Sequence, residues 1–136
     1  LFPTLSGGEQ QRVQLARILA QLWETEDACL FLDEPTSALD LKHQFQVLSL
    51  IHTICQRQSM TIVVILHDLN LARKFTHHSL LLKDGRLIAS GDSKRLLTSD
   101  RVEEAYQVRM KEVTDPDNGD VHLFFDQNDA VNSQQL

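Results

Sequence analysis

Residues 28–40 read Ala-Cys-Leu-Phe-Leu-Asp-Glu-Pro-Thr-Ser-Ala-Leu-Asp, and this stretch decides the fold. It opens with an uncharged apolar run, which two carboxylates, Asp33 and Glu34, follow at once before Pro35. A short apolar run that ends at a turn signal is typical of a buried strand in a parallel sheet. Because ligands of open α/β sheets bind beyond the carboxyl ends of the strands, we expect the two acids to face a binding crevice. Taken alone, the acids fit a strand that ends in a polar turn equally well.

A second apolar run, residues 61–66, is rich in β-branched side chains and predicts another buried parallel strand. His67 ends this run, and Asp68 then predicts the N-cap of a helix over 69–75. A lone histidine at a strand end is more often structural, but His67 lies one strand–helix unit past the acid pair and is expected at the same edge of the sheet. The other histidines lack such placement and are interpreted as structural or solvated: His43, His52, His77, His78 and His122.

The N-terminal segment contains Ser6-Gly7-Gly8-Glu9 ahead of apolar residues at helical spacing. A serine followed three residues later by a glutamate predicts a capping box, with Ser6 as the N-cap of a helix over 6–23. Glycines there leave the first backbone N–H groups approachable, and the helix dipole favours an anion such as phosphate. The capping box turns Glu9 back toward the Ser6 amide, and Arg12 one turn later offsets its charge.

The rest of the chain predicts further helices and two antiparallel hairpins. Asp40 is the expected N-cap of a helix over 41–58. Asp84-Gly85 between two apolar runs predicts a hairpin, two short capped helices follow it, and a last hairpin spans 108–125. The apolar face of the 41–58 helix is expected to consist of Phe45, Leu48, Ile51, Ile54 and Cys55.

The composition of the 136 residues indicates one globular domain with a modest core. The net charge of −6 argues against nucleic acid as a general partner, because a duplex binder needs a basic face. No apolar run has membrane-spanning length. Cys29 and Cys55 lie among apolar residues and are expected to be buried, reduced thiols of a cytosolic protein, and the cysteines and histidines show no metal-ligand spacing.

Three of these segments resemble motifs of the ABC-type ATPases. Residues 30–40 resemble the Walker B and D-loop segment, residues 5–13 resemble the signature motif, and His67 matches the switch histidine. The resemblance covers residues 1–126 and implies an α/β fold of the P-loop NTPase type, of which this chain is the C-terminal portion. Residues 127–136 are polar and are expected to be a disordered tail.

The resemblance also implies roles for the residues near the helix N-terminus. Ser6, Gly7 and Gly8 would close on the γ-phosphate of an ATP molecule held by a second copy of the subunit. Glu9 stands where the most common form of the signature has glutamine. Asp40 would lie at the subunit interface while it also caps its helix.

The acids and the histidine after the two strands would carry the chemistry of ATP hydrolysis. The resemblance implies that Asp33 binds Mg²⁺, that Glu34 is the general base, and that His67 contacts the γ-phosphate. One carboxylate suffices for a magnesium ion that keeps waters and phosphate oxygens, and a base at a strand end is held rigidly.

The sequence contains no Gly-x-x-x-x-Gly-Lys-[Ser/Thr] segment that would cradle the phosphates. We therefore expect the chain alone neither to bind ATP tightly nor to hydrolyse it. Without the early strands of the family, we also expect an unpaired sheet edge and exposed apolar faces. For these reasons we interpret the chain as a natural remnant or a partial sequence of a longer ATPase.

Two C-terminal segments resemble those of the ATPases that serve importers of iron chelates, haem or cobalamin. Within that group they are most similar to haem-importer ATPases. The segments are residues 97–102 and the turn at 115–119, and Glu9 fits the same group. The resemblance implies a homodimer bound to transmembrane permease subunits on the cytoplasmic face of the inner membrane, served indirectly by a periplasmic binding protein. Two alternatives remain: a fragment of a non-transport ABC ATPase and an inactive dimerisation remnant.

Overall fold

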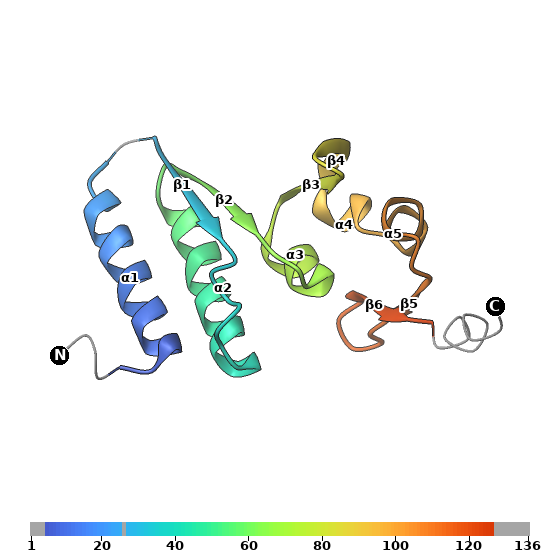
Figure 1. Cartoon of the computed structure of the whole chain (residues 1–136), viewed down its shortest axis with the longest axis horizontal. Coiled ribbons are helices and arrows are strands. Elements are labelled where there is room, and N and C mark those ends of the chain that lie inside the picture. Colours follow the sequence, from blue (N-terminus) through green and yellow to red (C-terminus); the bar gives the residue numbers. More distant parts are fainter. Residues whose placement is uncertain (1–4, 26, 127–136) are drawn as a thin grey trace. The chain divides into compact units, whose positions relative to one another are not determined.

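The computed structural model describes residues 5–25 and 27–126, and the chain divides into two compact units, Leu1–His67 and Asp68–Leu136. The first unit contains two helices and two strands in alternation (Figure 1). In chain order these elements are α1 (Gly7–Leu22), β1 (Ala28–Asp33), α2 (Leu41–Arg57) and β2 (Met60–Ile65).

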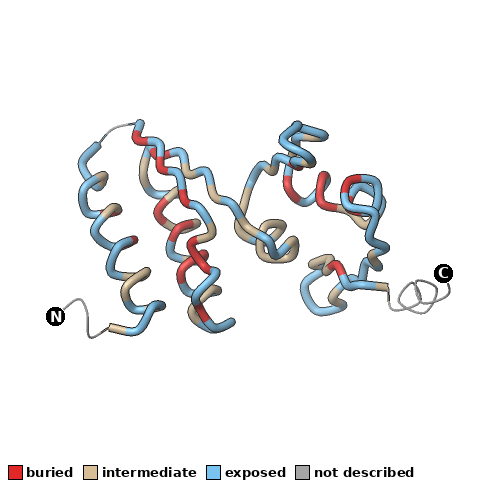
Figure 2. The backbone as a smooth tube through the Cα atoms, viewed as in Figure 1, coloured by how far each residue is buried: buried red, intermediate tan, exposed pale blue. Residues whose placement is uncertain are grey.

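β1 and β2 form a parallel pair joined by the helix α2, as the two apolar runs predict. Ala28 pairs with Met60 at one end of the register, and Asp33 pairs with Ile65 at the other. The buried residues of this unit lie on α1, on one side of β1, on α2 and at the start of β2 (Figure 2). They include Leu15, Leu19, Ala28, Leu30, Leu32, Val47, Leu48, Ile51, Ile54 and Met60.

The prediction of a fully buried β1 is wrong for one face of the strand. Residues of β1 alternate between buried and exposed, and the Phe31 side chain is 74 % exposed. Val63 and Ile65 of β2 are exposed on the same face, because Phe31 pairs with Val63 in the register. Within the described residues the sheet has two strands, so the expected unpaired edge and exposed apolar face are both present.

The prediction of two buried cysteines is also wrong. Cys29 is exposed and Cys55 is half-buried, and both are free thiols. Cys29 lies in β1 at the position before Leu30, and alternation therefore places it on the uncovered face. On α2, Phe45 is likewise exposed, and Val47 is buried in its place.

Over residues 68–126, the second unit contains two antiparallel hairpins and three short helices. Its elements are α3 (Leu69–Phe75), β3 (His78–Lys83), β4 (Arg86–Asp92), α4 (Ser93–Leu96), α5 (Ser99–Tyr106), β5 (Met110–Thr114) and β6 (Val121–Phe125). Asp68, the predicted N-cap of α3, accepts from the first turn of that helix, and the side chains of Asp92 and Thr98 cap α4 and α5 in the same way.

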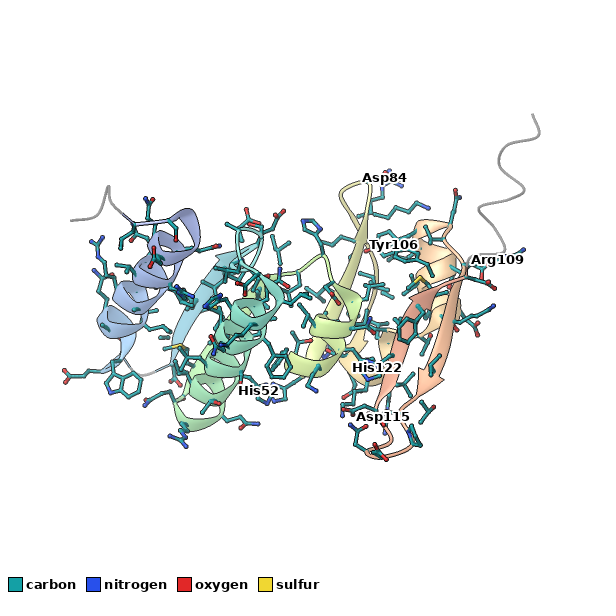
Figure 3. All side chains as sticks on the ribbon, turned by 90° about the horizontal axis from the view of Figure 1, so that it is seen from below. His52, Asp84, Tyr106, Arg109, Asp115 and His122 are labelled. Carbon is teal, nitrogen blue, oxygen red and sulfur yellow. The ribbon has the colours of Figure 1, made fainter. Side chains whose placement is uncertain are left out.

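The β3–β4 hairpin turns at Asp84 and Gly85, as the sequence predicts, and Asp84 lies at its tip (Figure 3). Both turn residues have left-handed backbones, with φ of 50° and 72°, which is the geometry of a type I′ turn. Beneath the hairpin, Leu81 packs with the α4 and α5 region. This core consists of Leu81, Leu96, Leu97 and Ala105, with Leu69, Ala72 and Ala89 against it.

Residues 127–136, for which the sequence predicts a disordered tail, lie outside the described residues. None of the helices in the described part of the chain is long and apolar enough to cross a membrane.

Candidate functional site

The side chains of Glu34 and His67 meet at the ends of the two parallel strands. Glu34 directly follows β1 and His67 comes two residues after β2. Their Oε1 and Nε2 atoms are 2.6 Å apart. An ionised carboxylate can only accept, so the Nε2–H of His67 is the donor. The expectation that the acid and the histidine lie at one edge of the sheet is confirmed.

The backbone of Glu34 has an uncommon conformation. Its φ is 44°, in the left-handed region that non-glycine residues rarely adopt. Its carbonyl oxygen accepts from the Ser37 amide at 3.2 Å and from the Ser37 hydroxyl at 3.1 Å. A third donor comes from the helix α1, whose Gln11 Nε2 lies 3.2 Å from the same oxygen.

Asp33 is the last residue of β1, and its side chain is exposed. Within the described part of the chain its carboxylate makes no hydrogen bond or ion pair, so both oxygens are open to a ligand. No group of three or more histidine, cysteine, aspartate or glutamate side chains among the described residues could enclose an ion. This donor set fits Mg²⁺, which binds through one or two carboxylates and completes its shell with water and phosphate oxygens.

The N-terminus of α1 forms the predicted capping box. The Ser6 hydroxyl accepts from the Glu9 amide at 3.4 Å, and the Glu9 carboxylate accepts from the Ser6 amide at 2.9 Å and from its hydroxyl at 2.7 Å. These bonds from Ser6, with a smaller contribution from the charge of Arg12, hold the pKa of Glu9 below its ordinary value. The carboxylate is thus ionised and directed back at Ser6, as expected.

The two glycines of this segment have different surroundings. A side chain built on Gly7 would meet nothing within 4 Å, so the backbone of Gly7 is open to an approaching ligand. A Cβ on Gly8 would lie 2.9 Å from Leu39 Cδ2 and 3.3 Å from the Ala38 carbonyl oxygen. Gly8 therefore also has a packing role against the loop after Glu34, which the sequence does not predict.

Asp40 caps α2 as predicted, because its Oδ1 accepts from the His43 amide at 2.9 Å. The His43 ring adds a second contact, with Nδ1 2.8 Å from the same oxygen. Both bonds lower the pKa of Asp40, the amide bond being the larger cause. His43 is therefore a partner of this cap, and its (i, i+3) spacing from Asp40 is the signal that could have identified it.

Gln11 is a further functional candidate: it lies within the signature-like segment 5–13, but the resemblance implies no role for it. It precedes Leu15 and Leu19 by one and two helical steps of four residues, and both leucines are buried. A polar residue in line with buried positions of a helix is the one sequence signal for its contact with Glu34.

The chain is similar in sequence to several known proteins that share one name. No model of a protein family matches the chain. The hemin import ATP-binding protein of Vibrio parahaemolyticus is 46 % identical over 110 residues, which are 80 % of this chain and 42 % of that protein. The protein of the same name from Gloeobacter violaceus is 47 % identical over 109 residues, 78 % of this chain and 39 % of its own. The chain thus spans about two fifths of the length of the curated relatives it matches.

Solved structures agree with these relatives. A putative metal-chelate type ABC transporter in an inward-facing conformation matches with a TM-score of 0.81 and 32 % identity, over 95 % of this chain and 51 % of that chain. A dimeric ATP-binding cassette in a post-hydrolysis state, bound to ADP and inorganic phosphate, matches with a TM-score of 0.55 and 36 % identity over 67 % of this chain and 37 % of that one.

Proposed function

We propose that this chain, which over its matched length belongs to the ATP-binding subunits of ABC transporters, supplies the hydrolytic part of an ATPase that powers import of haem or a related iron chelate. The observation that carries the proposal is the pair of Glu34 and His67, 2.6 Å apart at the ends of neighbouring parallel strands. The names of the relatives support the cargo, and the resemblance of the turn at 115–119 agrees with them.

Glu34 is the proposed general base. A base of this kind accepts a proton from the water that attacks the γ-phosphate, and it must reach that water at hydrogen-bond distance. The Nε2–H of His67 fixes the direction of the Glu34 carboxylate by donating to Oε1, which leaves Oε2 for the water. The His67 side chain is 76 % exposed, so its ring remains accessible to the γ-phosphate.

Asp33 is the proposed magnesium ligand, because its exposed carboxylate directly precedes the base. Mg²⁺, when bound, neutralises charge on the phosphates of ATP. Ser6, Gly7 and Gly8 are the proposed contacts to the γ-phosphate of ATP on a second copy, where the first N–H groups of α1 favour an anion. Asp40 is proposed to lie at the same interface.

The proposal includes partners beyond this chain. A Gly-x-x-x-x-Gly-Lys-[Ser/Thr] loop must come from another segment, since this sequence has none, and the chain alone is proposed to be inactive. The second copy, the permease subunits and, indirectly, a periplasmic binding protein complete the importer, with this chain peripheral to the cytoplasmic face of the inner membrane.

ATP hydrolysis by this chain, paired with a separate polypeptide that carries the missing loop, tests the proposal. The pair should hydrolyse ATP, and Glu34→Gln should lower kcat by about 10²- to 10⁴-fold. Glu24→Gln, an exposed acid just after α1, is the matched control and should leave kcat unchanged. Hydrolysis no faster than that of the loop-bearing piece alone would favour the inactive remnant instead.

A further inference from the structure

The carbonyl oxygen of Glu34 accepts three hydrogen bonds, one of which comes from the helix α1, 23 residues earlier in the sequence. Two bonds come from Ser37, three residues on, and the third comes from Gln11 in the second turn of α1. We propose that Gln11 is a positioning residue: its amide holds the left-handed backbone of Glu34 so that the carboxylate meets His67. The proposed function enters only through the catalytic role that it gives to Glu34.

The conformation of Glu34 needs such a hold. A non-glycine residue at φ of 44° persists only where its surroundings fix it. The residue before a proline also prefers an extended backbone, and Pro35 follows Glu34 directly. Because the Glu34 side chain is 42 % exposed and that of His67 76 %, packing around the two side chains does little to fix them. The backbone carbonyl is therefore the point at which Glu34 is held.

The orientation of the Gln11 amide is determined by its acceptor. Nε2 faces the Glu34 carbonyl oxygen, and a flipped amide would set two oxygens against each other. The Oε1 atom of Gln11 is buried and has no hydrogen-bond partner among the described residues. Such an orphaned oxygen is unfavourable, and a leucine would fill the same space without it. Packing alone therefore does not account for an amide here, whereas the bond to Glu34 does.

A second contact keeps the helix that carries Gln11 close to the same loop. Gly8, one turn earlier, approaches Leu39 and Ala38 so closely that a Cβ would lie 2.9 Å from Leu39 Cδ2. The first two turns of α1 thus contact the loop between β1 and α2 at two points. Gln11 extends from a rigid element, which is what a positioning residue requires.

Two leucine variants of the full chain test this assignment. Gln11→Leu removes both the donor and the orphaned oxygen, while Gln10→Leu makes the same change where the amide donates to the Leu5 carbonyl at 2.9 Å. For each, we would measure the thermal midpoint and the ¹⁵N shifts of the His67 ring, which report whether Nε2 carries a hydrogen-bonded proton. Glu34→Ala gives the shifts of a His67 ring without its partner.

The expected result separates positioning from packing. Gln11→Leu should keep a midpoint at or above that of the wild type, yet move the His67 shifts toward those of Glu34→Ala. Gln10→Leu should leave the His67 shifts unchanged. Wild-type His67 shifts in a folded Gln11→Leu chain would overturn the assignment. If Gln11→Leu does not fold, Gln11→Met removes the same donor with an unbranched side chain, and wild-type His67 shifts in that folded chain would overturn the assignment equally.

The ATPase assay of the paired chain distinguishes this inference from the proposed function. Gln11→Leu should lower kcat about 10- to 100-fold with little change in KM, because a displaced base slows the chemical step without weakening ATP binding. An inactive wild-type pair contradicts the proposed function, and the His67 shifts then still decide the role of Gln11. An active pair whose kcat is unaffected by Gln11→Leu contradicts the inference alone.

Discussion

The carboxylate of Glu9 makes the stability of the first unit depend on pH. Its bonds from Ser6 lower its pKa in the folded chain below the ordinary value of 4.5, so the unfolded chain binds a proton more readily. Stability from this group is therefore present above the unfolded pKa and is lost as the pH falls through the folded pKa. We expect the thermal midpoint to drop more on acidification from neutral pH in the wild type than in Glu9→Gln, whose amide keeps the capping box without the titration.

The difference between the two acid profiles is the measurement, because other carboxylates titrate in both proteins. Asp40→Asn supplies a second comparison, since the bonds from His43 lower the pKa of Asp40 in the same direction. Parallel midpoint curves for the wild type and Glu9→Gln would show that the capping box does not persist in solution.

Substitution by alanine at the neighbouring residues Gly7 and Gly8 should change the stability of the chain in opposite directions. Gly7→Ala meets open space, and alanine's higher helix propensity should leave stability unchanged or raise it by up to about 1 kcal/mol. Gly8→Ala forces a Cβ against Leu39 and the Ala38 carbonyl, and overpacking of this kind costs about 1–3 kcal/mol. Urea denaturation of the two variants measures both values.

The ATPase assay of the paired chain then separates packing from phosphate contact in the same two variants. Gly7→Ala should lower ATPase activity although the fold is intact, because its methyl group covers an approachable backbone at the helix N-terminus. Equal stability of Gly7→Ala and Gly8→Ala would contradict the close approach of α1 to the loop after Glu34.

The sequence predicts much of the site at the residue scale, but not how it is held. Asp33, Glu34 and His67 are predictable because each comes at or just after the carboxyl end of a parallel strand. The left-handed backbone of Glu34 is not predictable, because both its residue type and Pro35 favour other conformations. The contact from Gln11 spans 23 residues, so the helical pattern can place Gln11 on the buried side of α1 but cannot identify the Glu34 carbonyl as its acceptor.

At the scale of helices and strands, the ends of the elements are predicted well because short-range chemistry determines them. The cap residues Ser6, Asp40 and Asp68 accept from the first-turn amides of α1, α2 and α3. The faces of the elements are predicted less well. Whether Phe31 or Phe45 is covered depends on which element lies opposite, and that information is not local.

The turn of the β3–β4 hairpin gives a prediction at this scale. Gly85 has φ of 72°, and a Cβ added to it would meet nothing within 4 Å. Gly85→Ala should therefore destabilise the second unit through backbone strain alone, by about 1 kcal/mol. Asp84→Gly, which relaxes the neighbouring left-handed residue, should cost little. Chemical denaturation of both variants measures the difference, and a neutral Gly85→Ala would exclude the type I′ turn.

At the scale of the whole molecule, the order of the motifs predicts the fold class. The exposed apolar surface has a different cause, because a two-stranded sheet leaves one of its faces uncovered within the described residues. Parallel sheets are normally covered on both faces, and the apolar runs of β1 and β2 are typical of such coverage. Here one face of each strand remains exposed within the described residues. The sequence therefore specifies strands suited to a larger sheet, consistent with relatives of which this chain spans about two fifths.

The uncovered face of the β1–β2 sheet predicts concentration-dependent self-association of the chain. Phe31 is 74 % exposed and Ile65 52 % exposed on a sheet whose outer edges are unpaired within the described residues, and such surfaces pair with other chains. Phe31→Thr, which keeps a β-forming residue, should reduce association in sedimentation velocity, and so should addition of the loop-bearing polypeptide. Leu41→Thr is the control, since Leu41 is 83 % exposed but lies on α2, and it should associate like the wild type. If Phe31→Thr associates as strongly as Leu41→Thr, the sheet face is not the contact, and apolar exposure elsewhere on the chain drives the association.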